Sequence, residues 1–296
     1  MTARQIFHFY PGLCKPILSF FAALSGAVGF LLANHPSWSA WSALPVLSGG
    51  VFLLACGACA LNHYQERNTD ALMPRPAGRP IPAGKVRPAH ALVFSLALIA
   101  SGATLLLSTG VSAAPLLGLA AILWYNGLYT WLKAHHAFAA LPGALVGAIP
   151  PAIGWTVGGG PFDMRLAAVC FFFFMWQVPH FMVHQQLFGK EYEAVRLPSL
   201  TGLLTRAQID RLTFQWLLAA AVSLQLVVIQ GLIRSPFVHI CLLAASLWFA
   251  ARGIALLKRR TPNYEGIFMA TNGFMLAVML LIFMDRLPRA LGWAGW

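Results

Sequence analysis

Two short polar clusters hold half of the acidic residues in this chain, which has only eight among 296 residues. The first cluster is NHYQERNTD, residues 62–70. Asn62, Glu66 and Asp70 recur every fourth residue, so on one helix they form a single oxygen-rich stripe. Mg²⁺ prefers oxygen ligands, takes one or two protein carboxylates and completes its shell with water and substrate phosphates. The stripe therefore predicts a magnesium site.

A basic, proline-rich segment follows this stripe, MPRPAGRPIPAGKVRP at residues 73–88. Its cations and Arg67 come within reach of the same surface, and Arg75 and Arg79 lie closest in sequence to the stripe. A metal stripe beside a basic loop suits an anionic diphosphate. A solvated helix end with a basic loop attracted to anionic lipid explains the same residues. This cluster alone does not separate the two interpretations.

The second cluster, GKEYE at residues 189–193, follows the segment WQVPHF at residues 176–181. Glu191 and Glu193 stand two residues apart and cannot share a helix face, so at most one points into a site. Glu191, next to Lys190, is favoured over Glu193. Gln177 and His180 are polar groups in an apolar segment, and such groups usually face the interior of a helix bundle. His180 fits either a packing residue or a ligand.

Tyr129 and Lys133 stand one helical turn apart at the end of another apolar segment. An aromatic belt with a snorkelling lysine explains them, and so does a role in which both reach the diphosphate. Cys56 and Cys59 form a CxxC pair without the second ligand pair or thioredoxin-like setting that chemistry requires. We interpret them as small residues at a helix contact.

The composition indicates an integral membrane protein. Hydrophobic residues make up 59% of the chain and charged residues only 9%, whereas soluble domains carry about 25% charged residues. A net charge of +12 would suit nucleic acid only on a water-facing basic domain, and no polar segment is long enough, so we expect no nucleic-acid partner. The start of the chain lacks the small-residue cleavage site of a removable signal peptide. The five scattered cysteines indicate no disulfide framework.

Nine apolar runs of about 20 residues predict an all-α fold, a polytopic bundle of nine transmembrane helices forming a single domain, residues 1–296. The predicted spans are 16–34, 42–61, 89–109, 112–132, 139–158, 164–186, 212–233, 235–257 and 266–284. Strands are not expected, because these runs are long and continuously apolar, whereas the strands of membrane barrels alternate apolar and polar residues with a period of two. With nine spans, 16 of the 20 Lys and Arg residues fall on the side of the N-terminus, which the positive-inside rule makes cytoplasmic. The long cytoplasmic loops 62–88 and 187–211 are expected to cap the site.

The ordered motifs LNHYQERNTDALMPRPAGRP, YTWLKAHHAFAALPGALVGAIPPAIGW and WQVPHF, the last followed by KEY and LPSL, resemble the protohaem IX farnesyltransferase family. That family belongs to the UbiA-type intramembrane prenyltransferase superfamily. The resemblance runs from Lys15-Pro16 through the sixth span in order and spacing. It implies a UbiA-like bundle around a central cavity, with acidic motifs on the cytoplasmic face that bind Mg²⁺ and farnesyl diphosphate. It also implies transfer of the farnesyl group to a vinyl carbon of haem B, with water added, to give haem O.

Transferred by position, the resemblance makes Asn62, Glu66 and Asp70 the first metal-diphosphate motif and Glu191 the second. The side chains expected to bind substrate are Arg67, Arg75, Arg79, Tyr129, Lys133, Gln177, His180 and Lys190. The expected cofactor is Mg²⁺. The expected partners are farnesyl diphosphate, haem B and membrane lipid, and the resemblance allows for contacts with haem A synthase or a terminal oxidase. The expected location is the bacterial cytoplasmic (inner) membrane, with the C-terminus on the far side.

The chain departs from the family pattern at several positions. Glu66 and Glu191 stand where the family usually has Asp, Asn68 replaces a further Asp, and Ala134 replaces an Arg. A glutamate still supplies carboxylate oxygens, so these changes bear on the acceptor more than on the diphosphate donor. The alternatives are prenylation of another acceptor such as a quinone-precursor ring, a non-catalytic membrane subunit, or a transporter. A transporter would need ionisable residues near the bilayer midplane, whereas the acids here crowd one face.

Overall fold

Every element of the structure is helical in the residues that it describes, which confirms the all-α prediction. The computed structural model describes residues 3–33, 41–258 and 262–290. Arg259 and Arg260, which the assignment of sides counted, lie outside these residues. The helices are α1 (Ala3–Cys14), α2 (Pro16–Ala33), α4 (Ala43–Gln65), α5 (Arg67–Asp70), η1 (Pro76–Gly78), α6 (Pro88–Leu107), α7 (Ala113–Ile122), η2 (Leu123–Tyr129), α8 (Thr130–His135), η3 (Ala137–Ala139), α9 (Ala140–Ala144), η4 (Leu145–Ala148), α10 (Ile149–Val157), α11 (Met164–Ala194), α12 (Leu200–Leu203), α13 (Arg206–Ile229), α14 (Pro236–Lys258) and α15 (Tyr264–Ala290).

Eight helical stretches among the described residues are long and apolar enough to cross a membrane. The remaining predicted span, 112–132, is also helical, and it is divided by helix type into α7, the π-helical segment η2 and α8. The residues at both junctions keep right-handed helical angles, so the three pieces form one continuous helix over 113–135. The stretch 137–157 is divided as well, into η3, α9, η4 and α10. Its prolines, such as Pro142 and Pro150, remove backbone donors and break regular helix.

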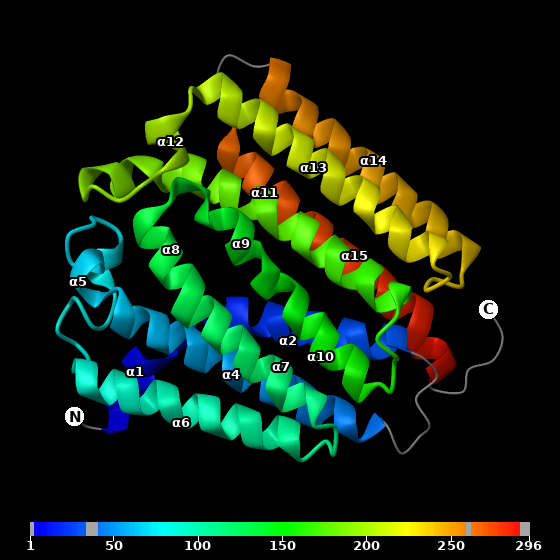
Figure 1. Cartoon of the computed structure of the whole chain (residues 1–296), viewed down its shortest axis with the longest axis horizontal. Helices are drawn as coiled ribbons and strands as arrows, with labels where there is room; N and C mark the ends of the chain where they lie inside the picture. Colours follow the sequence, from blue (N-terminus) through cyan, green and yellow to red (C-terminus); the bar gives the residue numbers. More distant parts are fainter. Residues whose placement is uncertain (1–2, 34–40, 259–261, 291–296) are drawn as a thin grey trace.

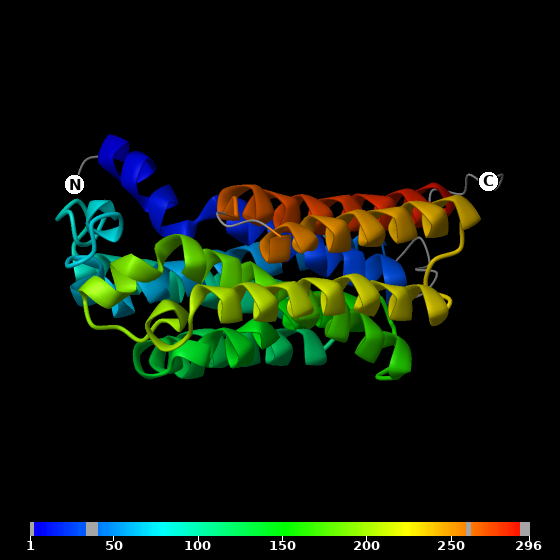
Figure 2. The ribbon, with the colours of Figure 1, turned by 90° about the horizontal axis from the view of Figure 1, so that it is seen from above.

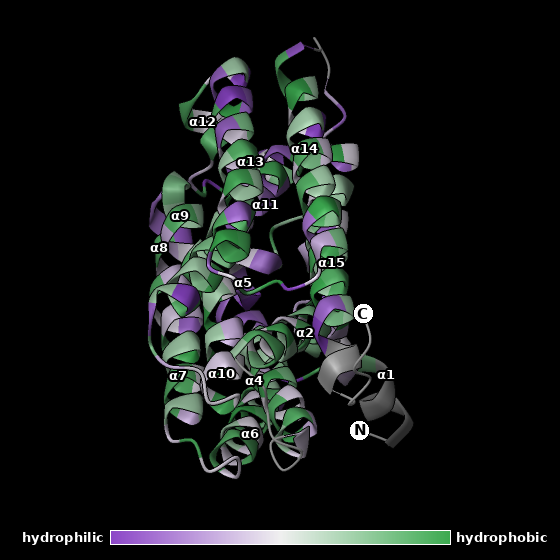
Figure 3. Ribbon diagram, turned by 90° about the vertical axis from the view of Figure 1, so that its right-hand side faces the viewer, coloured by the Kyte–Doolittle hydropathy of each residue, from purple (hydrophilic) through white to green (hydrophobic). Residues whose placement is uncertain are grey.

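The long helices lie side by side in an elongated bundle (Figures 1 and 2). Helix α5, which follows α4, and helix α12, which follows α11, lie at the same end of the bundle (Figure 1). Seen from its other end, the bundle shows mostly hydrophobic residues along its helices (Figure 3). Large apolar side chains are exposed on the outside, among them Leu123 at 73% and Ile240 at 67%. Such an apolar surface suits contact with lipid, and the helices satisfy their own backbone hydrogen bonds there.

Close helix crossings rest on glycine. A Cβ atom added at Gly154 of α10 would lie 1.7 Å from the carbonyl oxygen of Gly26 in α2. Small residues of this kind let backbones approach closely inside membranes. Beside this contact, the buried rings of Trp155, Phe172 and Phe274 join α10, α11 and α15 in one core. The bundle therefore holds the ends of α4 and α11 in fixed positions.

The helix boundaries at the polar end differ from two expectations. The first concerns the predicted span 42–61 and the stripe of Asn62, Glu66 and Asp70 on one helix: α4 continues to Gln65, Glu66 leaves helical geometry with φ −86° and ψ 1°, and α5 resumes at Arg67. The Asp70 amide still donates to the Glu66 carbonyl at 2.8 Å, so the turn continues across the break. The second concerns the predicted loop 187–211, which is only 195–205, because α11 runs to Ala194 and a capping box at Thr205 starts α13.

Candidate functional site

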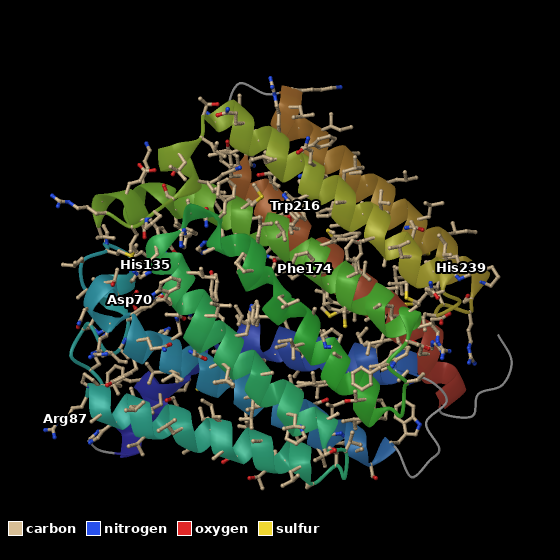
Figure 4. The ribbon with its side chains drawn as sticks, viewed as in Figure 1. Asp70, Arg87, His135, Phe174, Trp216 and His239 are labelled. Atoms are coloured by element: carbon tan, nitrogen blue, oxygen red, sulfur yellow. The ribbon has the colours of Figure 1, made fainter. Side chains whose placement is uncertain are left out.

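The first acidic cluster lies where α4 passes into α5. Asn62 is buried, and its Nδ2 donates to Thr130 Oγ1 on α8 at 3.4 Å. Glu66 occupies the break between the helices, and Asp70 ends α5 with only 3% exposure. Asp70 lies at the same end of the bundle as His135, whereas His239 lies at the opposite end (Figure 4).

Basic side chains bind both carboxylates of this cluster. Lys133 Nζ lies 2.9 Å from Glu66 Oε1. Arg79 donates through one NH group to Asp70 Oδ2 at 2.6 Å, and the same group lies 3.8 Å from Glu66 Oε2. The guanidinium of Arg79 therefore stands between the two acids. This arrangement brings together four of the predicted residues, from the α4–α5 junction, α5, α8 and the basic loop.

The two carboxylates differ in their electrostatic surroundings. Burial by itself would raise the pKa of Glu66, but the Lys133 ammonium, its hydrogen bond to the carboxylate and the other donors and cations nearby together hold that pKa below its ordinary value. Burial raises the pKa of Asp70 above its ordinary value, although the Arg79 guanidinium acts in the opposite direction. The cluster thus pairs one strongly stabilised carboxylate with one whose charge the protein stabilises less well.

The second cluster faces the basic loop through Glu191. Arg75 Nε lies 3.6 Å from Glu191 Oε2, and this buried oxygen accepts no hydrogen bond from the described residues. The Arg75 guanidinium also lies over the Phe188 ring, 4.0 Å from its centroid. Glu193 is engaged elsewhere, since its Oε1 accepts hydrogen bonds from Ser199 at 2.8 Å and Thr201 at 2.5 Å. Of the two glutamates, Glu191 is the one that contacts the basic loop.

Tyr129 and Lys133 point into the bundle. Lys133 pairs with Glu66, as described above, and lies 5.3 Å from the centroid of the Tyr192 ring on α11. The Tyr129 ring stacks between Tyr125 at 5.6 Å and Phe181 at 5.7 Å. The aromatic rings therefore form a wall directly beside the ionic cluster, and they connect the α7–α8 stretch with α11.

Gln177 and His180 lie deeper along α11. Gln177 packs over Gly147, where an added Cβ atom would come within 2.8 Å of the amide oxygen. The His180 ring stacks on Trp176 at 5.2 Å and lies 4.9 Å from the ring of Phe268 on α15. Its Nδ1 is buried and makes no hydrogen bond with the described residues. Their neighbours named here are Gly147 and aromatic rings, and neither residue forms an ion pair with the described residues of the cluster.

Two predicted residues are not brought into the cluster. Arg67 donates to the carbonyl oxygen of Tyr64 at 2.6 Å and lies over the Tyr64 ring, back along α4. Lys190 is exposed and forms no ion pair or hydrogen bond with any residue that the structure describes. Both predictions assumed that nearness in sequence brings a cation into the site. On a helix, adjacent residues point in different directions.

Lys15 is a cation that the sequence reasoning missed. It stands between α1 and α2 with a left-handed φ of 45°, a conformation that is uncommon for residues other than glycine. Burial lowers its pKa, and Glu66, Arg79 and Lys133 lie within electrostatic range of its ammonium. The available signal was the Lys-Pro step at the start of the first predicted span.

A metal ion would need ligands beyond the protein. Within the described ranges, no three His, Cys, Asp or Glu side chains lie close enough to hold one ion. The oxygens present belong to Asn62, Glu66, Asp70 and Glu191, and they suit a hard cation that keeps waters and shares substrate phosphates. Cys56 and Cys59 are buried free thiols in α4. The donor set fits a metal-diphosphate complex and does not fit a closed all-protein metal cage.

Known proteins are similar to this chain in sequence and in fold. The chain is 35% identical to a protoheme IX farnesyltransferase of Geobacter sulfurreducens over 95% of this chain and 100% of that protein. It is 35% identical to a protoheme IX farnesyltransferase of Nitratidesulfovibrio vulgaris, over 88% of this chain and 92% of the relative. Among solved structures, a UbiA homologue from Aeropyrum pernix superposes with a TM-score of 0.73 at 16% identity, covering 93% of this chain and 98% of that one.

A UbiA homologue from Archaeoglobus fulgidus, solved with DMAPP and Mg²⁺, superposes with a TM-score of 0.64 at 13% identity, covering 92% of this chain and 98% of that one. At such identities the structural likeness concerns the fold alone. Residues 20–282, most of the chain, match the UbiA prenyltransferase family. The protein therefore belongs to the UbiA prenyltransferase family.

Proposed function

We propose that this protein transfers the farnesyl group of farnesyl diphosphate to a vinyl group of haem B, with Mg²⁺, and so produces haem O and diphosphate. The observation that supports this most is the convergence of carboxylates and cations at one end of the bundle. Arg79 lies between Asp70 and Glu66, Lys133 pairs with Glu66, and Arg75 pairs with Glu191. Unlike an ordinary surface ion-pair network, this group adjoins a wall of stacked aromatic rings.

The residues present fit a divalent cation that carries a diphosphate. Asn62, Glu66, Asp70 and Glu191 would hold it, and their oxygens suit Mg²⁺. Bound Mg²⁺ would supply positive charge that stabilises the departing diphosphate. The buried Glu191 Oε2, which accepts no hydrogen bond within the described part of the chain, is an acceptor that such a complex would satisfy.

The cations of the chain would stabilise the leaving group directly. Arg75, Arg79, Lys133 and Lys15 surround the carboxylates and can donate to diphosphate oxygens as the bond to the farnesyl carbon breaks. Several of these donors already lie where charge would develop, held by the ion pairs described above. Catalysis would then need little reorganisation around the leaving group.

The aromatic wall would protect the allylic cation. Tyr129, stacked between Tyr125 and Phe181, presents ring faces beside the ionic cluster. Aromatic faces attract cations, and such an attraction strengthens where water is excluded. We propose that farnesyl lies along these rings while the vinyl carbon attacks, after which water adds to the resulting cation next to the porphyrin.

The haem acceptor is supported by the names of the relatives, protoheme IX farnesyltransferases at 35% identity over nearly the whole chain. Gln177 and His180 are proposed to contact the acceptor. Loop 66–87 and residues 187–205 are proposed to cap the site. We place the protein in the bacterial cytoplasmic membrane with this end in the cytoplasm. Contacts with haem A synthase or a terminal oxidase belong to the same proposal.

The test incubates the detergent-purified protein with haem B, farnesyl diphosphate and Mg²⁺, beside an EDTA control, and follows the pigment by mass spectrometry. The proposal expects a hydrated, farnesylated haem that forms only with the metal. Release of diphosphate with a farnesylated quinone precursor, but no haem product, would refute the acceptor and retain prenyl transfer. No bound or released diphosphate under any condition would refute the enzyme and favour a non-catalytic subunit.

A further inference from the structure

His184 is a polar side chain that the proposed chemistry leaves without a role. It lies on α11 one helical turn after His180 and is half-buried. Its ring nitrogens form no hydrogen bond with any residue that the structure describes; its neighbours there are rings and charges at a distance. Its nitrogens are not among the enclosed polar atoms of the described residues, so they keep accessible surface. An accessible imidazole nitrogen without a protein partner is available to bind a ligand.

The surroundings of His184 are aromatic on the inside and cationic toward the ionic cluster. Its ring centroid lies 4.7 Å from that of Phe188 and 6.2 Å from that of Phe268. Phe188 also carries the Arg75 guanidinium, which pairs with Glu191. The charges of Arg75 and Lys133 reach His184. The histidine therefore lies between the proposed diphosphate site and the apolar side of the bundle.

The other histidines offer this arrangement less well. His180 Nδ1 is fully enclosed. His63 is 2% exposed, with both nitrogens enclosed. His135 is exposed near the end of α8, where its Nδ1 contacts the Trp131 carbonyl at 2.7 Å. His184 keeps accessible surface, has no polar partner in the described part of the chain, and adjoins the proposed donor site.

From this geometry we propose that His184 is an axial ligand to the iron of a haem bound as acceptor. The proposal rests on the haem acceptor proposed above. Imidazole is a common axial ligand of haem iron, and its nitrogen lone pair forms the coordinate bond without any change in oxidation state. Phe188 and Phe268 would contact the porphyrin. Iron ligation at this point would hold the macrocycle next to the diphosphate site, which is the proximity that a two-substrate reaction requires.

The experiment measures haem binding without farnesyl diphosphate, so it does not depend on turnover. Ferric haem B is titrated into the full-length protein in detergent, and the Soret band and the electron paramagnetic resonance spectrum are recorded. Wild-type protein is expected to give the signature of imidazole-ligated iron. His184→Ala is expected to lose this signature and to bind haem about tenfold more weakly, which corresponds to about 1.4 kcal/mol. Added imidazole should restore the signature to His184→Ala.

His90→Ala is the matched control, because His90 is exposed on α6 and its replacement should leave the spectrum unchanged. If His184→Ala fails to elute as a monodisperse protein, His184→Gln removes the ligand while it keeps a polar side chain. An unchanged spectrum in the folded variant would overturn the proposal, as would loss of the signature in His180→Ala or His135→Ala instead. Haem ligated by His184 in a protein that forms no farnesylated product would refute the proposed function and leave this inference standing.

Discussion

At the scale of single residues, the chemistry depends on carboxylates that the protein itself neutralises. Asp70 is buried, and its carboxylate accepts a hydrogen bond from Arg79 at 2.6 Å. A bound metal-diphosphate complex would contact both of these side chains. We expect Asp70→Asn to lower the rate of farnesyl transfer at least about 100-fold, because the amide lacks the carboxylate charge that a metal requires. The fold should persist, since Asn can still accept from Arg79. Transfer rate and thermal unfolding in detergent check this, and near-normal transfer would contradict the metal assignment.

The Glu66–Lys133 pair is a second residue-scale test. Replacing Lys133 by Met leaves a half-buried Glu66 carboxylate with Arg79 at 3.8 Å as its remaining ion-pair partner among the described residues. We expect a loss of about 1–3 kcal/mol in stability, because the Glu66 carboxylate loses its closest ion-pair partner and keeps its desolvation cost. The double variant Glu66→Gln/Lys133→Met should recover part of that loss. Additive effects in this cycle would show that the pair is not coupled.

At the scale of elements, the shape of the α7–α8 stretch positions Tyr129. A Cβ atom added at Gly143 of α9 would lie 2.4 Å from the Tyr129 ring. We expect Gly143→Ala to push this ring out of its stack and to cost about 1–3 kcal/mol through overpacking, together with a loss of farnesyl transfer. Gly127→Ala is the control, since an added Cβ there meets nothing within 4 Å. Equal activity of the two variants would contradict a role for the Tyr129 stack.

The elements also show what the sequence could predict. Long apolar runs gave the all-helical fold, and a four-residue spacing correctly grouped Glu66 with Asp70. The π-helical turn η2 was not predictable from its own residues, because contacts across the bundle accompany it: Gln65 of α4 exchanges hydrogen bonds with Asn126 at 2.8 and 3.0 Å. The left-handed conformation of Lys15 was also missed, because the local propensity of residues other than glycine disfavours it. Lys190 was included on sequence proximity alone and points away.

At the scale of the whole molecule, both acidic clusters lie at one end of the bundle, where α5 and α12 lie (Figure 1) and where Arg75 pairs with Glu191, and the proposed orientation makes this end cytoplasmic. Single cysteines placed in a variant without the five natural ones test it. We expect Ser108→Cys, at the exposed end of α6, to react with an impermeant maleimide on intact spheroplasts. Ala83→Cys in the exposed basic loop should react only after lysis. The excess of Lys and Arg at this end predicts that it is cytoplasmic. The reverse labelling pattern would contradict that orientation.

The central claim is that Glu191, together with the first cluster, holds a metal-bound diphosphate. The most direct measurement is the affinity for farnesyl diphosphate by calorimetry, with Mg²⁺ and with EDTA, in wild-type protein and in two matched variants. We predict binding that requires Mg²⁺ and weakens at least about tenfold, or about 1.4 kcal/mol, in Glu191→Gln. Glu193→Gln should bind as the wild type does, since Glu193 is hydrogen-bonded to Ser199 and Thr201. Binding that is independent of Mg²⁺, or lost in Glu193→Gln and kept in Glu191→Gln, would contradict the account.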